Sequence, residues 1–154
     1  MIDDLKPAEI EELLHAELVA RIGCHADGNT YVVPITYAYD GEGIIGHSID
    51  GMKVRMMRQN PQVCIEIDRM ENPSTWQSVI AWGTYEELAG DDARHAMGVL
   101  MERFAPLMTS ETSQPTDPEH GMDQATLAKG ERPQAVIYRI RLTEKTGRFE
   151  RPQH

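Results

Sequence analysis

The sequence predicts a mainly β domain in which six antiparallel strands form a small barrel with helices at its ends. Short runs rich in Val, Ile, Tyr and Trp are separated by turns that contain Gly, Asn or Asp, as is typical of antiparallel sheets. Two longer segments and one short segment show the helical spacing of apolar residues. The chain has 154 residues and no internal repeat, so we expect a single domain over residues 1–154.

The first third of the chain predicts one helix and three strands. Pro7 suits the first turn of a helix, and apolar residues follow it at helical spacing, which predicts an amphipathic helix over 7–17. The period then changes, and two turns predict a three-stranded meander over 18–26, 30–40 and 44–48. Pro34 lacks the N–H that a central strand needs, so we expect it at an edge or a bulge and treat it as a candidate ligand position.

The middle of the chain predicts a short helix, two strands and a longer helix. Gly51 and the Asn60–Pro61 pair bound a helix over 52–59. Residues 62–68 and 75–90 have the composition of strands, the second being long enough to bend at Gly83. Acidic residues then begin a helix over 91–105, which Pro106 ends.

The last third is less regular. Residues 107–132 are rich in Thr, Ser, Pro and Asp without periodicity, and a connection of this length predicts a loop or lid. Residues 135–142 predict the sixth strand. We expect the polar tail that begins at Thr143 to be exposed at its tip.

Composition narrows the function classes. Apolar residues make up 40% of the chain and charged residues 26%, with a mean hydropathy of -0.47, which favours a globular cytoplasmic protein without a membrane segment. The 15 basic and 25 acidic residues give a net charge of -10, which disfavours a nucleic-acid partner. Cys24 and Cys64 form no disulfide framework, and the histidines lack the spacing of metal ligands, so we assign no metal.

The segment 46–53, Gly-His-Ser-Ile-Asp-Gly-Met-Lys, carries the clearest chemical signal. Here a predicted strand ends and a predicted helix begins, and the free N–H groups of a helix N-terminus favour an anion. Ser48 adds a hydroxyl donor, Gly51 permits close approach and Lys53 supplies a positive charge. The alternative is that Ser48 or Asp50 only caps the helix and that Lys53 is solvated.

Four short motifs in order resemble one known family. They are VPxxY at 33–37, GHSxxGxK at 46–53, NPxVC at 60–64 and SVxxxG at 78–83. Together they resemble the FMN-binding split β-barrel superfamily, in the pyridoxamine 5′-phosphate oxidase-like branch that includes the nitroimidazole-resistance proteins. The resemblance implies a six-stranded antiparallel split barrel with Greek-key character, and a homodimer with FMN in grooves between the subunits.

The resemblance also implies which residues hold the cofactor. The flavin ring would lie against Pro34, Ile35 and Thr36, and the phosphate would lie at His47, Ser48, Met52 and Lys53. The polar edge of the flavin would meet Gln77, Ser78 and Val79. His47 is the candidate catalytic residue, which could donate a proton to a reduced substrate; the alternative is that it only hydrogen-bonds a neighbour or the phosphate.

The resemblance also implies an activity, that of an FMN-dependent reductase of small aromatic or nitro compounds with a reduced nicotinamide as electron donor. Tyr31, Thr36 and Met52 stand where true pyridoxamine 5′-phosphate oxidases carry basic residues, and their Arg-Leu-x-Pro tail is missing, which disfavours a second substrate phosphate. Two alternatives stay open. One is a non-catalytic flavin-binding protein for storage or sensing, and the other is a barrel that binds haem or a deazaflavin.

Overall fold

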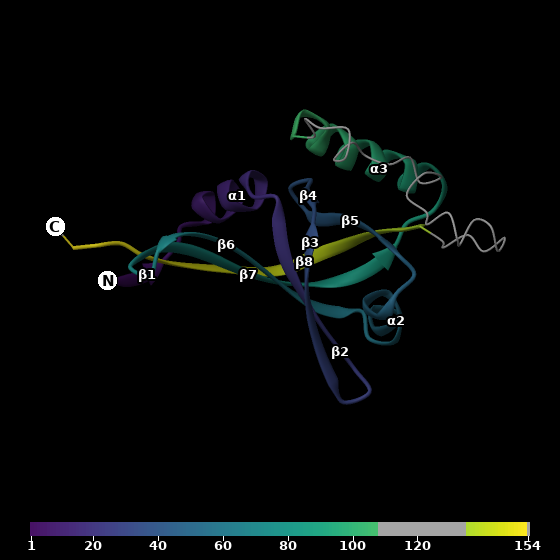
Figure 1. The fold of residues 1–154 in the computed structure, drawn as a ribbon, viewed down its shortest axis with the longest axis horizontal. Coiled ribbons are helices and arrows are strands. Elements are labelled where there is room, and N and C mark those ends of the chain that lie inside the picture. Colours follow the sequence, from purple (N-terminus) through teal and green to yellow (C-terminus); the bar gives the residue numbers. More distant parts are fainter. Residues whose placement is uncertain (108–134, 154) are drawn as a thin grey trace.

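The computed structural model describes residues 1–107 and 135–153, so nearly all of the predicted loop or lid at 107–132 lies outside the described residues. Within these residues, eight strands and three helices follow one another (Figure 1). The helices are α1 (Pro7–Ala16), α2 (Met52–Gln59) and α3 (Gly90–Phe104), the last followed by a 3₁₀ turn at Ala105–Leu107. The strands are β1 (Ile2–Asp4), β2 (Val19–Ala26), β3 (Asn29–Thr36), β4 (Ala38–Tyr39), β5 (Gly43–Ile49), β6 (Gln62–Asn72), β7 (Thr75–Glu87) and β8 (Ala135–Glu150).

All pairs between the described strands are antiparallel, in the order β3-β2-β6-β7-β8-β5-β4, with β1 on the C-terminal part of β8. The two ends of this order are joined in the chain, because β3 ends at Thr36 and β4 begins at Ala38. The sheet must therefore curl until its two ends approach each other, although β3 and β5 do not pair with each other among the described strands. This is a split barrel, and the predicted mainly β fold class is confirmed.

The strand count and two connections differ from the prediction. There are eight strands rather than six, since β1 also pairs and the predicted strand 30–40 is interrupted at Tyr37. The three-stranded meander forms only in part: β2 pairs with β3 and β4 pairs with β5, but β5 pairs mainly with β8 and not with β3. Gly83 does mark an irregularity, with a register shift beside it, and a Cβ there would lie 2.5 Å from the Arg141 carbonyl oxygen.

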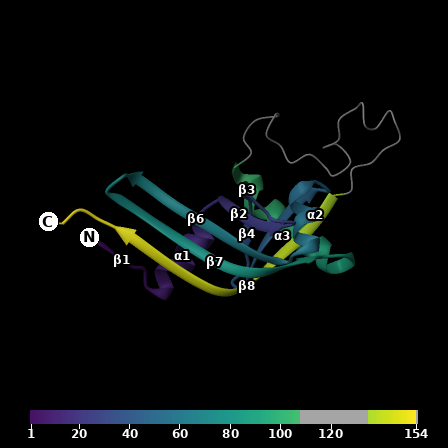
Figure 2. The same ribbon diagram turned by 90° about the horizontal axis from the view of Figure 1, so that it is seen from below.

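The C-terminal segment is the largest correction. Residues from Thr143 to Glu150 continue β8 and pair with the first half of β7, and the last three of them also pair with β1. Figure 2 shows β6, β7 and β8 as three long neighbouring strands, with both termini at one end of the sheet. The predicted end of the strand at residue 142 was wrong because residues 143–150 have one face toward solvent and lack an apolar alternation. Residues 151–153 at the tip are exposed, as expected.

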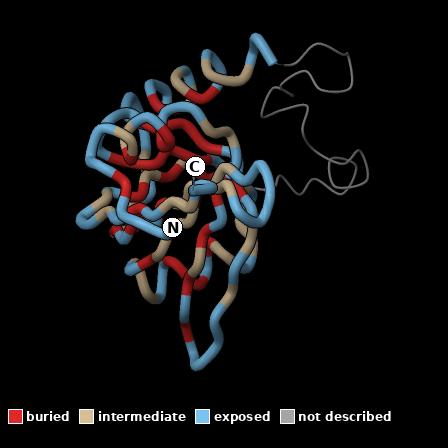
Figure 3. Tube along the Cα trace, turned by 90° about the vertical axis from the view of Figure 1, so that its left-hand side faces the viewer, coloured by how far each residue is buried: buried red, intermediate tan, exposed pale blue. Residues whose placement is uncertain are grey.

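The main core combines buried residues of α1 with buried residues of the sheet, and the buried stretches of the chain are red in Figure 3. Leu13 and Leu14 of α1 are fully buried there. A smaller cluster joins α3 to the β4–β5 hairpin through Ala96, Leu100, Ala38 and Ile45. Both cysteines are free; Cys24 is buried and Cys64 is half-buried.

Candidate functional site

The junction between β5 and α2 has the geometry of an anion site. Lys53 is half-buried, and its Nζ donates to Ser48 Oγ at 2.8 Å. Gly51 is the N-cap of α2 in an extended conformation, no side chain caps the helix, and its first turn contains no acidic residue. The first N–H groups of α2 are therefore free of side-chain acceptors, next to a lysine ammonium and a hydroxyl.

This arrangement decides against the simpler alternative. Neither Ser48 nor Asp50 caps α2. The Ser48 hydroxyl instead donates to the Ile49 carbonyl oxygen at 2.8 Å, and Asp50 accepts a hydrogen bond from Arg58. Lys53 is half-buried rather than fully solvated, and this burial lowers its pKa. The positive charge of Lys53 acts on two neighbouring groups. It helps to lower the pKa of His47, and it opposes the rise that burial causes in the pKa of Cys24 of β2.

His47 lies near the C-terminal end of β5; the residue as a whole is exposed, but its ring is partly buried. Partial burial and, second, the charge of Lys53 lower its pKa. The ring is therefore mostly neutral at pH 7, with one nitrogen able to donate and the other to accept a hydrogen bond. An anion bound beside Lys53 would raise the pKa of His47 again.

Asp50 is the one acid inside the junction, and two arginines of α2 face it. Arg58 donates to Asp50 at 3.2 Å, and Arg55 lies 3.8 Å from the same carboxylate. Arg58 also pairs with Glu87 at the end of β7. The Glu87 carboxylate accepts a hydrogen bond from the Tyr85 hydroxyl at 2.9 Å. The charge of Asp50 is thus compensated by α2, which leaves Lys53 as the positive group toward Ser48.

The predicted flavin-ring residues lie on β3, at one end of the sheet order. Pro34 is at this edge, as predicted, and pairs in register with Arg21 of β2. Pro34 and Thr36 point outward and are exposed, whereas the Ile35 side chain is buried in the core. Only the backbone of Ile35 could therefore contact a ligand on this face.

The three predicted β7 residues face different ways. Ser78 points outward and donates to Glu66 at 3.3 Å, Val79 is 1% exposed in the core, and Gln77 accepts from Arg69 at 3.5 Å on the side of α1. β7 is three strand steps from β3, which is about 14 Å at the usual strand spacing. The structure therefore brings His47, Ser48 and Lys53 together but keeps Ser78 apart from Pro34 within one chain. Met52 is 61% exposed at the start of α2.

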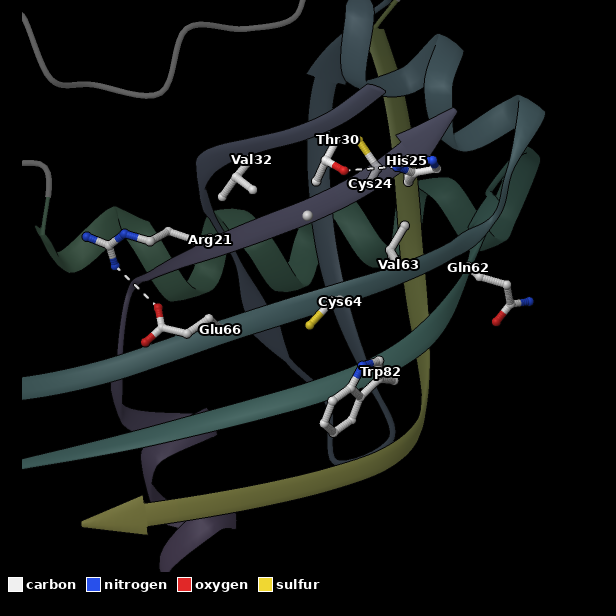
Figure 4. A pocket seen from close by; sticks show the side chains of 11 residues that line it. Arg21, Cys24, His25, Thr30, Val32, Gln62, Val63, Cys64, Glu66 and Trp82 are labelled. Atoms are coloured by element: carbon white, nitrogen blue, oxygen red, sulfur yellow. Dashed lines mark hydrogen bonds and ion pairs between the residues drawn. The ribbon is translucent and has the colours of Figure 1, made fainter. Parts of the chain in front are cut away.

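A cavity of about 600 Å³ lies on the outer face of β3, β2, β6 and β7 (Figure 4). It was not predicted from the sequence, although the isolated Gly23 within a strand pattern is a signal of close approach. Its lining combines apolar and polar side chains: Arg21, Gly23, Cys24, His25, Thr30, Val32, Gln62, Val63, Cys64, Glu66 and Trp82.

A cluster of two acids and one arginine borders this cavity. An Arg21 guanidinium nitrogen lies 3.7 Å from both Glu66 and Asp68, which are two residues apart on the same face of β6. Burial first, and then the hydrogen bond and charge of Asp68, raise the pKa of Glu66 to about 7, while Ser78 and Arg21 oppose the rise. Glu66 is therefore substantially protonated near neutral pH.

Comparison with known proteins identifies the family. A family model described as pyridoxamine 5′-phosphate oxidase matches residues 6–149. The chain belongs to this family. The resemblance inferred from the four sequence motifs is thereby confirmed, and the family match extends over both the β5–α2 junction and the outer-face cavity.

Two solved structures of similar proteins share the fold of this chain. An FAD-binding protein from Mesorhizobium loti is 28% identical, with a TM-score of 0.71 over 97% of this chain and 98% of the other. A candidate 5-nitroimidazole antibiotic resistance protein from Bacteroides thetaiotaomicron is 18% identical, with a TM-score of 0.70 over 97% of this chain and 87% of the other. Because the second protein is only 18% identical, its similarity shows a shared fold and nothing more.

An uncharacterised protein from Rhizobium meliloti is 36% identical over 87 residues, which is 56% of this chain and 58% of the relative. The match thus spans little more than half of that relative's length. Among the described residues, no helix is long and apolar enough to cross a membrane, and no group of three or more His, Cys, Asp or Glu side chains could hold a metal ion.

Proposed function

We propose that this protein is a flavin-binding oxidoreductase that holds the phosphate of FMN at the β5–α2 junction. The observation that carries the proposal is the Lys53–Ser48 contact at the uncapped start of α2. The family and the FAD-binding relative from Mesorhizobium loti support a flavin. FMN and FAD both carry a phosphate on the ribityl chain, so the same junction suits either molecule.

In this proposal each element of the junction has a separate task. Lys53 and the first N–H groups of α2 bind the phosphate, and Ser48 orients the lysine. The exposed Pro34 and Thr36 of β3 give a face for the flavin ring. His47 holds or releases a proton beside Lys53. When bound, the flavin would transfer electrons from a reduced nicotinamide to a small aromatic or nitro compound.

We also propose that the protein is a homodimer with a flavin between its subunits. Ser78 lies three strand steps from Pro34, so a single flavin that meets both positions would take them from different subunits. Exposed apolar side chains on the outer faces of β2, β3 and β7 support such an association; they are Val19, Val32, Ile80 and Trp82, with exposed fractions of 43%, 61%, 37% and 39%.

Two spectroscopic steps test this function. The purified protein is mixed with FMN or FAD and desalted, and the visible spectrum is recorded; we expect retained flavin bands with FMN. NADH or NADPH is then added without oxygen, followed by nitroaromatic compounds and quinones. We expect bleaching by one nicotinamide and recovery of colour with an acceptor. Retained flavin that neither nicotinamide reduces would contradict the reductase and favour storage or sensing, while a Soret band on addition of haem would favour a haem protein.

A further inference from the structure

We propose that Arg58 is a positioning residue that holds the Asp50 carboxylate away from the proposed phosphate site at the start of α2. Without this hold, the carboxylate would compete with the phosphate for the free N–H groups of the helix and would repel it. The inference rests on the proposed function, because it explains how an acid beside the junction is kept from opposing the binding of an anion.

Asp50 is placed in the chain where its charge matters for that site. It lies between Ser48 and the N-cap Gly51, and α2 begins at Met52. The first N–H groups of α2 are not capped by any side chain. A carboxylate near a helix N-terminus is stabilised by such groups and by the helix dipole. Asp50 is therefore a local competitor for an anion that the same groups would bind.

The Asp50 carboxylate has few other partners among the described residues. Its Oδ2 accepts a hydrogen bond from Arg58 Nη1 at 3.2 Å. Its Oδ1 is buried and accepts no hydrogen bond from a described residue, although Arg55 Nε lies 3.8 Å away. A buried acceptor without a donor is costly. The bond to Arg58 therefore decides where the carboxylate stays, and a released carboxylate would turn to the nearest free donors.

Arg58 can hold Asp50 because its own guanidinium is fixed. While Nη1 faces Asp50, Nε and Nη2 both donate to the carboxylate of Glu87, the second at 3.3 Å. A planar guanidinium presents these groups in a rigid fork. The hydrogen bond from Arg58 lowers the pKa of Glu87, and the Tyr85 hydroxyl donates to the same carboxylate at 2.9 Å. Arg58 thus connects the start of α2 to the end of β7.

Arg55 is a matched control on the same helix. Its side chain is 74% exposed, against 41% for Arg58, and it lies beside the same carboxylate without a hydrogen bond. Of the two arginines, only Arg58 also pairs with a second described carboxylate. An effect of charge alone would make the two residues nearly equivalent, whereas a positioning role belongs to Arg58.

The test is a double-mutant cycle, measured by fluorescence titration with FMN and with riboflavin, which lacks the phosphate. Arg58→Gln should weaken FMN binding about tenfold and leave riboflavin binding unchanged. Asp50→Ala should change the FMN affinity of wild type by less than about twofold, but should restore it in the Arg58→Gln background. Arg55→Gln should stay within about twofold of wild type.

A second measurement needs no flavin. In the ligand-free protein, the backbone amide signals of Met52 and Lys53 in NMR spectra should shift in Arg58→Gln, because the released carboxylate accepts from the first N–H groups of α2. The signals should return in the double variant with Asp50→Ala. If Arg58→Gln does not fold, Arg58→Lys replaces it: the charge stays, but one ammonium does not reproduce the fork between two carboxylates. It should also lose FMN affinity and regain it with Asp50→Ala.

Three results would overturn the proposal. The first is an Arg58→Gln variant that binds FMN as wild type does. The second is an equal gain from Asp50→Ala in both backgrounds, which would mean that Arg58 acts through its charge alone. The third is an equal loss of FMN and riboflavin affinity, which would mean that Arg58 only stabilises the fold. A wild type that binds FMN no better than riboflavin would contradict the proposed phosphate site itself, and the inference with it.

Discussion

At the residue scale, Lys53 differs from most of the described basic side chains because its partner is a hydroxyl group and not a carboxylate. The described arginines largely face carboxylates, as Arg58 faces Asp50 and Glu87 and Arg21 faces Glu66. For Lys53 the structure records a hydroxyl partner and no ion pair with a described carboxylate. A partly buried positive charge without an acid costs solvation energy, and an anion bound beside it would recover that energy.

We expect His47 to make flavin binding at the proposed site depend on pH. Its pKa is lowered in the free protein by partial burial and by Lys53, and a nearby phosphate favours the protonated ring, so binding takes up a proton. We expect the affinity for FMN to rise severalfold between pH 8.5 and pH 6.5, measured by quenching of flavin fluorescence. In His47→Gln this slope should flatten, and an unchanged slope would place His47 outside the phosphate site.

Two strand glycines should differ sharply in their response to a methyl group. A Cβ at Gly46 would lie 2.5 Å from the hydroxyl oxygen of Tyr138, a fully buried residue. Gly46→Ala should therefore lower the free energy of unfolding by about 2–3 kcal/mol. Gly23→Ala, with ordinary contacts, should change it by less than about 0.5 kcal/mol. Urea denaturation measures both, and equal losses would contradict the close packing of Tyr138 on Gly46.

The sequence predicted part of the site at this scale. The junction of Ser48, Gly51 and Lys53 could be recognised because its residues are local in the chain. The Arg21–Glu66–Asp68 cluster could not, since it depends on the register between β2 and β6. Gln77, Ser78 and Val79 were predicted as a group, but neighbouring strand residues alternate between faces, and only the Ser78 side chain points to the outer face.

At the element scale, the C-terminus of α1 is held by side chains from distant segments. The last carbonyls of a helix have no partner within the helix. Here the buried Tyr37 hydroxyl donates to Leu14 at 2.8 Å, and Arg103 of α3 donates to Ala16 at 2.8 Å and to His15 at 3.2 Å. These bonds attach α1 to both the sheet and α3.

Removal of one such bond should loosen α1. Tyr37→Phe keeps the buried ring but leaves the Leu14 carbonyl oxygen without its hydroxyl donor, which should lower the free energy of unfolding by about 1–2 kcal/mol. Thermal denaturation followed by circular dichroism measures the loss. Tyr31→Phe is the control, because Tyr31 is only half-buried and its hydroxyl makes no recorded hydrogen bond with a described residue; an equal loss in both would contradict the capping role.

Elements with strong local signals were predicted best. Helices α1, α2 and α3 lie within one or two residues of their predicted bounds, because caps, Pro and apolar period act over a few residues. Strand β8 was predicted to end at Leu142 and continues to Glu150. Its second half reads as polar sequence, and pairing with β7 and β1 rather than local propensity extends the strand.

At the scale of the whole molecule, the sheet closes because β3 and β4 are adjacent in the chain but lie at opposite ends of the strand order. The sequence predicted a barrel from the number of strands, yet strand order depends on contacts between distant segments and could not be inferred from periodicity. The four-motif resemblance supplied the split-barrel class, and the pairing of β5 with β8 explains why the predicted meander forms only in part.

The proposed homodimer makes a prediction for the molecule in solution. Sedimentation equilibrium should give twice the chain mass of 17.4 kDa. Each chain carries a net charge of -10, and the two subunits repel at long range, so we expect association to strengthen as salt rises from 50 to 500 mM. A single-chain mass at all salt concentrations would contradict the dimer.

The most direct test of the proposed flavin phosphate site compares FMN with riboflavin, which lacks the phosphate. The affinities are measured for wild type, for one lysine variant and for one arginine variant. Lys53→Ala and Arg55→Ala each remove one positive charge from the same helix. Lys53 donates to Ser48, whereas the largely exposed Arg55 lies beside Asp50 instead. Fluorescence titration should show that wild type and Arg55→Ala prefer FMN to riboflavin by about 10- to 100-fold. Lys53→Ala should lose most of this preference while its affinity for riboflavin is unchanged. Equal affinities for FMN and riboflavin in wild type, or equal effects of the two substitutions, would contradict a phosphate site at Lys53.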